Sequence, residues 1–191
     1  LSHSLISEEM QDPQLKRMVE IIGYEEGMPV VTDPKILDPK AFIDEVLTVR
    51  FPNPFMPDTP QRIATDTSQK LAIRFGETIK SYLASDQLKV SDLKLIPLVF
   101  AGWLRYLMGL DDELNLFTPS PDPRLEEAQA YLKDITIGMK GPFPELKGLL
   151  KDESIWGVNL GIGMADLVLS YFAELIAGKG AVRKTLLKYV K

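Results

Sequence analysis

The sequence contains no cysteine and a single histidine. Without cysteine the chain can form neither a disulfide nor a thiolate metal site, and one histidine cannot build a histidine metal cage. We therefore expect no metal cofactor in this chain. The absence of cysteine is also compatible with a reducing compartment, and we expect a cytoplasmic protein.

Long apolar runs and free basic clusters are also missing. No segment reaches the ~18–20 consecutive apolar residues of a membrane span, and the longest candidate, residues 95–108, is interrupted by Pro97 and Arg105. This segment predicts a buried core helix instead. The formal net charge is −5, which argues against nucleic acid or an anionic membrane as a partner.

Helical signals dominate the remaining sequence. The 191 residues, of which 45% are apolar, suit one ordinary domain, and strand-like alternation is nearly absent. Four helix starts share one device, an N-cap oxygen followed by proline at the first helical position: Asp12-Pro13, Asp38-Pro39, Thr59-Pro60 and Asp122-Pro123. The sequence therefore predicts an all-α fold, with residues 1–191 forming a single multi-helix domain.

Apolar spacing predicts further helices after these starts. They cover residues 73–83, 91–108 with Ser91 as cap, 145–150, 156–176 and 181–190, with loops at 111–123 and 138–144. The glycines of Gly157-Val-Asn-Leu-Gly161-Ile-Gly163 follow no predicted strand, and the apolar periodicity continues through them. We interpret them as sites of close helix packing, since a dinucleotide-binding loop requires a preceding strand.

A charged pattern follows the third of these helix starts. Arg62, Asp66 and Lys70 recur every four residues and would form one stripe on one face of a helix. Such a stripe is either a positioned polar site or a surface ladder worth only ~0.3–0.5 kcal/mol per pair. The approach, residues 51–57, contains three prolines and two aromatic residues, which favours a firmly held site.

Five blocks in register carry a family resemblance over essentially the whole chain. They are Arg50-Phe-Pro-Asn-Pro, Asp58-Thr-x-x-Arg62-Ile-Ala-x-Asp66-x-Ser68-Gln-Lys70, Ala101-Gly-Trp-Leu-Arg-Tyr-Leu-x-Gly109-x-Asp111-Asp112, Asp122-Pro123-Arg124 and Gly180-Ala-Val-Arg183-x-x-Leu. Together they resemble the C-terminal domain of the mannitol dehydrogenase family, the long-chain polyol and hexuronate dehydrogenases. This family includes fructuronate reductase, also called D-mannonate oxidoreductase, and mannitol 2-dehydrogenase.

The resemblance implies an NAD-dependent oxidoreductase involved in carbohydrate metabolism. In this family an N-terminal Rossmann domain, absent from this chain, holds NAD, and the chemistry needs no metal. A lysine acts as general base, and the asparagine and histidine of a Lys-x-x-x-x-Asn-x-x-His motif stabilise the oxyanion. The family's substrate-contacting positions correspond to Arg62 and Lys70, with Asp66 in a supporting role.

His3 does not fit the catalytic position. Ser2-His3-Ser4 resembles the end of the catalytic motif, yet only a few residues separate it from Glu8-Glu-Met10-Gln-Asp12-Pro13, where the family has four to five helical turns. We interpret residues 1–7 as the end of a connection and His3 as an exposed bystander. The catalytic residues are then expected upstream of Leu1, so residues 1–191 alone should be inactive.

The charge pattern favours a sugar acid as substrate, because Arg62 and Lys70 together suit a carboxylate. The predicted reaction interconverts fructuronate and mannonate, with mannitol or another polyol as the alternative substrate. A different class of function, a non-enzymatic helical interaction or scaffold module, would leave the same charges in solvent. The aromatic residues Trp103, Trp156, Phe51, Phe55 and Tyr106 are expected to pack in the core.

Overall fold

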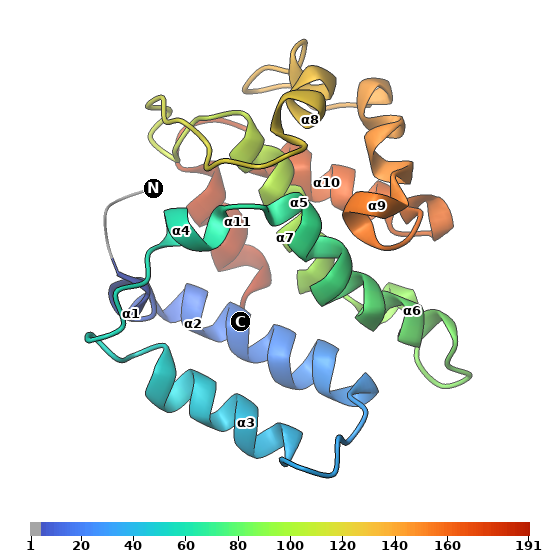
Figure 1. The fold of residues 1–191 in the computed structure, drawn as a ribbon. Coiled ribbons are helices and arrows are strands. Elements are labelled where there is room, and N and C mark those ends of the chain that lie inside the picture. Colours follow the sequence, from blue (N-terminus) through green and yellow to red (C-terminus); the bar gives the residue numbers. More distant parts are fainter. Residues whose placement is uncertain (1–4) are drawn as a thin grey trace.

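The computed structural model describes residues 5–191, and over this range the chain is all-α (Figure 1). It forms no strand there apart from an isolated antiparallel bridge between Leu110 and Leu116. None of the described helices is long and apolar enough to cross a membrane. The prediction for His3 lies outside the described residues.

The α-helices differ widely in length. They are α1 Ile6–Glu9, α2 Pro13–Ile21, α3 Pro39–Glu45, α4 Pro60–Ala64, α5 Thr67–Leu71, α6 Glu77–Leu83, α7 Leu95–Leu107, α8 Leu125–Leu132, α9 Glu153–Trp156, α10 Ala165–Leu175 and α11 Ala181–Tyr189. π-helical turns continue α2 (Ile22–Gly27) and α3 (Val46–Arg50) and join α5 to α6 (Ala72–Gly76). Short 3₁₀ turns occur at Met28–Val30, Val90–Asp92, Pro144–Lys147, Leu149–Lys151 and Leu160–Ile162.

Three of the four predicted helix starts are confirmed. The side chains of Asp12, Asp38 and Thr59 each accept a backbone N–H from the first turn of the helix that follows, and proline occupies the first helical position. Each cap satisfies donors that have no partner within the helix. A local signal in the sequence therefore determines where α2, α3 and α4 begin.

The core is built around α7, which packs most extensively against α10. Residues on every side of α7 are buried, including Phe100, Trp103 and Leu104, as expected of a helix that is apolar all round. Figure 1 shows α2 and α3 side by side as an outer layer, with α7 and α10 deeper in the molecule and α8 and α9 at the opposite end. The predicted core helix at 95–108 is thus confirmed.

The N-terminus of α7 is capped by a carboxylate from a distant part of the chain. Glu26 is 4% exposed, and its Oε1 accepts the N–H groups of Lys94 and Leu95, both at 2.6 Å, while Oε2 accepts that of Ile96 at 2.8 Å. The predicted cap at Ser91 was wrong, because the residues around it form a separate 3₁₀ turn. The N–H groups at the start of α7 are therefore accepted by Glu26, which is distant in the sequence, and not by the nearby Ser91.

The long helix predicted over residues 156–176 was also wrong. Gly157 (φ +80°) ends α9, Gly163 (φ +112°) ends a 3₁₀ turn, and α10 begins only at Ala165. Both glycines adopt backbone conformations that interrupt a helix. Close packing does occur at Gly157, since a Cβ there would lie 2.7 Å from the Cα of Gly76. The predicted helix at 145–150 proved to be two 3₁₀ turns.

Replacing Glu26 by Gln should destabilise the fold by about 1–3 kcal/mol, because an amide supplies one acceptor oxygen where the carboxylate supplies two. The measurement is urea unfolding followed by far-UV circular dichroism. Glu25→Gln is the matched control, since the exposed Glu25 forms only a surface pair with Arg17 at 2.9 Å. Equal unfolding midpoints for the two variants would contradict the proposed importance of this cap.

The glycine contact gives a second stability prediction. Gly76→Ala should cost about 1–3 kcal/mol, because its Cβ would lie 2.7 Å from the backbone oxygen of Trp156 and force the two segments apart. Gly102→Ala, in the middle of α7, meets no atom within 4 Å and should stabilise by about 0.5–1 kcal/mol through helix propensity. Thermal unfolding of both variants checks the opposite signs.

Candidate functional site

The segment that carries the predicted site residues is not one helix. α4 ends at Ala64, Thr65 is extended at ψ 138°, and Asp66 takes the left-handed conformation at φ +55° before α5 begins. The expected stripe of Arg62, Asp66 and Lys70 along one continuous helix was therefore wrong. Residue spacing alone cannot reveal a break at a non-glycine residue, where left-handed backbone is uncommon.

The loop at residues 120–122 braces this break. The Oγ of Ser120 donates to the carbonyl of Gln61 at 2.8 Å, and the carbonyl of Pro121 accepts the N–H of Asp66 at 3.0 Å. The carboxylate of Asp122 accepts both the N–H and the hydroxyl of Ser68, at 2.7 and 2.5 Å. These contacts fix the left-handed residue in place from outside the segment.

Asp122 had been expected to start its own helix, and this prediction was wrong. α8 begins only at Leu125, with Arg124 in the cap position. Asp122 accepts hydrogen bonds from the first turn of α5, to which Ser68 belongs. The carboxylate of Asp122 also accepts the nearby N–H of Arg124 at 2.9 Å, so it serves its own turn and the N-terminus of a helix far away in the sequence.

Lys70 reaches back across the break to the end of α4. Its ammonium donates to the carbonyls of Ile63 at 2.9 Å and Thr65 at 2.5 Å. These carbonyls lie at the C-terminal end of the short helix, where unpaired acceptors favour a cation. Two of the three ammonium protons are used in this way, so one remains for a ligand.

Arg62 forms a side-on pair with Asp58. Its Nε donates to Oδ1 at 2.5 Å and its Nη2 to Oδ2 at 2.7 Å, and its side chain remains 71% exposed. The pKa of Asp58 is lowered, first by the hydrogen bonds from Arg62 and to a smaller degree by the charge of Lys70. Both cations therefore act on one carboxylate.

Arg62 and Lys70 thus flank the same break, but each has contacts other than those predicted. Arg62 pairs with Asp58 and Lys70 with two backbone carbonyls, whereas the side chain of Asp66 forms no hydrogen bond or ion pair with any described residue. Asp66 contributes to the break through its backbone, whose N–H donates to Pro121. Sequence reasoning missed Asp58, although it stands four residues before Arg62, the same spacing that had drawn attention to Asp66.

The aromatic residues that were expected to pack in the core differ in how deeply they are buried. Trp103 and Trp156 are buried, and their rings meet edge to face at a centroid distance of 5.3 Å. Tyr106 is half-buried, and its hydroxyl accepts the N–H of Ser120 at 2.5 Å. The expectation of packing fails for Phe55, which is 91% exposed, while Phe51 is half-buried.

A groove of about 540 Å³ begins at the first turn of α4, where Pro60 forms part of its wall. Its other lining residues include Ile6, Leu15, Tyr106 and Val182, from α1, α2, α7 and α11. The groove also borders Arg105, which is buried and donates to the backbone carbonyls of Leu110, Asp111 and Leu175. Burial lowers the pKa of this guanidinium, whose contacts hold the end of α7 to the following loop.

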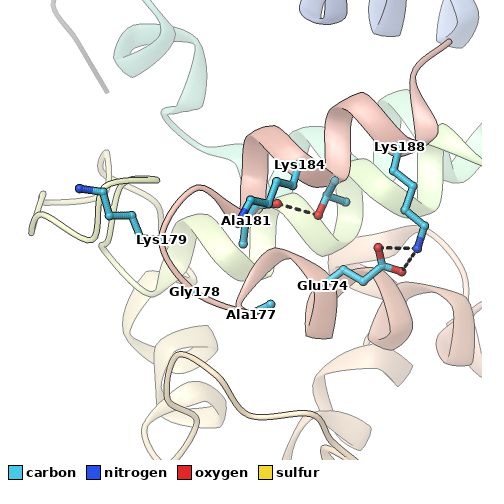
Figure 2. A pocket seen from close by; sticks show the side chains of 8 residues that line it. Glu174, Ala177, Gly178, Lys179, Ala181, Lys184 and Lys188 are labelled. Carbon is cyan, nitrogen blue, oxygen red and sulfur yellow. Dashed lines mark hydrogen bonds and ion pairs between the residues drawn. The ribbon is translucent and has the colours of Figure 1, made fainter.

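A smaller depression of about 240 Å³ lies between α10 and α11 (Figure 2). Lys188 points toward Glu174 and pairs with it at 2.9 Å, while Lys179 points away from the cavity and pairs with Glu113. Arg62 and Lys70 are not among the residues that line it. The described residues also contain no group of three or more potential metal ligands.

Comparison with known sequences gives a family match. A family profile described as the mannitol dehydrogenase C-terminal domain matches residues 1–168. A D-mannonate oxidoreductase from Thermotoga maritima is 50% identical over 188 residues, which are 97% of this chain and 35% of that protein. A mannitol 2-dehydrogenase from Emericella nidulans is 30% identical over 97% of this chain and 34% of its own length. The chain thus spans about a third of these relatives.

The fold also matches a solved structure. The mannitol 2-dehydrogenase of Pseudomonas fluorescens, solved as a ternary complex with NAD and D-mannitol, superimposes with a TM-score of 0.79 at 22% identity. The match covers 96% of this chain and 35% of that one. At this identity the likeness concerns the fold alone.

The left-handed residue at the break gives a prediction of its own. Asp66→Val should destabilise the chain by about 1–2 kcal/mol, because a β-branched side chain is strained at positive φ. Asp66→Asn is the matched control and should be nearly neutral, since asparagine tolerates this conformation. Urea unfolding of both variants checks the prediction, and equal stability would show that the backbone relaxes at this position.

Proposed function

The chain belongs to the mannitol dehydrogenase family as its C-terminal domain, and we propose that it is the substrate-binding domain of an NAD-dependent oxidoreductase. The reaction interconverts a ketose-type sugar acid and its hydroxy acid, such as fructuronate and mannonate. The observation that supports the proposal is that Arg62, paired side-on with Asp58, and Lys70, bonded to the carbonyls of Ile63 and Thr65, flank the same break in the chain. These are the two positions to which the family resemblance assigns substrate contact.

The free donors of the two cations suit an oxygen-rich ligand. After pairing with Asp58, Arg62 retains both N–H groups of Nη1 and one of Nη2, and one N–H from each of these nitrogens lies along the free edge of its planar fork. Such an edge binds a carboxylate or two neighbouring hydroxyls through paired hydrogen bonds. Lys70 adds its remaining N–H from the end of α4.

The relatives support a sugar acid more than a polyol. The protein from Thermotoga maritima, at 50% identity, carries the name D-mannonate oxidoreductase. Mannitol or another polyol is the second candidate, because relatives at about 30% identity are mannitol 2-dehydrogenases. A non-enzymatic scaffold receives no such support, since these relatives are named as oxidoreductases.

NAD would supply the hydride acceptor or donor in this reaction. Residues 5–191 contain no strand apart from the isolated bridge, so they do not fit the βαβ unit that binds dinucleotides. We assign NAD, the general-base lysine and its asparagine and histidine helpers to the Rossmann-containing part of the full-length protein. The role of residues 1–191 is then to bind and orient the sugar, without turnover on their own.

Arg62→Ala in the full-length protein should raise KM or lower kcat/KM for the sugar acid by more than tenfold, or about 1.4 kcal/mol of binding. The comparison uses mannonate and mannitol as alternative substrates, with NAD as oxidant. Arg74→Ala is the matched control, because Arg74 is an exposed arginine in the π-helical turn after α5, beyond the break that follows α4. Unchanged kinetics for Arg62→Ala would remove this residue from the site.

A further inference from the structure

Asp58 and Arg62 differ sharply in how firmly they are held. The side chain of Asp58 is 19% exposed and that of Arg62 is 71% exposed. The Asp58 N–H donates to the carbonyl of Met56 at 2.8 Å, and its carbonyl accepts the N–H of Ile6 at 2.9 Å. The backbone of Asp58 is therefore anchored on both sides, whereas the arginine projects from it into solvent.

The side-on pair restricts the guanidinium in two ways. Two parallel hydrogen bonds define both the plane and the direction of the fork, which a single bond would leave free to rotate. The edge formed by Nη1 and the second N–H of Nη2 is turned away from Asp58 by the geometry of the group. An otherwise flexible side chain is thus presented to a ligand in one orientation.

The pair between Asp58 and Arg62 should contribute little to the stability of the fold. Surface pairs between neighbouring turns contribute roughly 0–1 kcal/mol, so removing this pair should hardly change the free energy of unfolding. The carboxylate of Asp58 offsets the charge of the guanidinium that it holds, so selective binding by Arg62 must depend more on the direction of its donors than on charge alone.

We propose that Asp58 is a positioning residue, which holds Arg62 so that its unoccupied edge meets the carboxylate or neighbouring hydroxyls of the sugar. This inference rests on the proposed function of Arg62. Asp58 touches no reacting atom in this scheme and acts only through the arginine. Its loss should therefore weaken substrate binding while the chemical step is preserved.

The test is steady-state kinetics of Asp58→Asn in the full-length protein, with mannonate and NAD. We expect KM for the sugar acid to rise about five- to tenfold with kcat changed less than twofold, the signature of lost uniform binding. Asp58→Glu retains the charge but displaces the carboxylate by one methylene, and should also raise KM. Glu77→Gln is the matched control, since it removes an exposed pair with Lys80 at 2.7 Å.

A double-mutant cycle with Arg62→Ala separates the possible results. If Asp58 acts through the arginine, Asp58→Asn has no further effect once Arg62 is alanine. A tenfold defect in Arg62→Ala beside wild-type KM in both Asp58 variants would overturn the positioning role and leave the proposed function intact. An added defect of Asp58→Asn in the Arg62→Ala background would likewise overturn it. No defect in Arg62→Ala would overturn both.

Thermal unfolding accompanies the kinetics. Melting temperatures of Asp58→Asn and Glu77→Gln within a few degrees of the unmodified protein are expected, since the guanidinium lost from the first pair and both partners of the second pair are exposed to solvent. If Asp58→Asn melted much earlier, and Asp58→Glu kept wild-type stability together with wild-type KM, the residue would be structural and the inference wrong.

Discussion

The structure depends most on the carboxylate of Glu26 at the N-terminus of α7. That helix is the centre of the core, so its first N–H groups are shielded from water and need protein acceptors. Glu26 supplies both of its oxygens to them. The same solution recurs at α11, whose first N–H groups are accepted by Asp112, and at α5, where Asp122 serves.

These long-range contacts connect the core to the candidate site. Arg105 on α7 holds the loop that follows the helix, and Tyr106 accepts a hydrogen bond from Ser120. Ser120, in turn, begins the loop that braces the break between α4 and α5. The positions of Arg62 and Lys70 are thus determined by a buried helix as well as by their own segment. A site held in this way gains its precision from the packing beneath it.

Sequence reasoning succeeded where the physical cause is local. Asp12, Asp38 and Thr59 each cap the helix that begins at the next residue, and the proline at that first helical position makes the helix start recognisable in the sequence. It failed where the partner is distant, as for Asp122 and Glu26, because one sequence does not show which helix an acidic side chain will reach. It also failed at Asp66, whose backbone is fixed by Pro121. The roles of Arg62 and Lys70 in substrate binding remain predictions.

The distant caps have a consequence for how the chain folds. The hydrogen bonds of Glu26 to α7 span 68–70 residues, and those of Asp112 to α11 span 70–71. Helical proteins with mainly local contacts form quickly, because little loop entropy is lost before each contact is made. Here the first N–H groups of the central helix meet their protein acceptors only when a remote segment arrives. These remote caps should make this chain a slower and more cooperative folder than its helical content suggests.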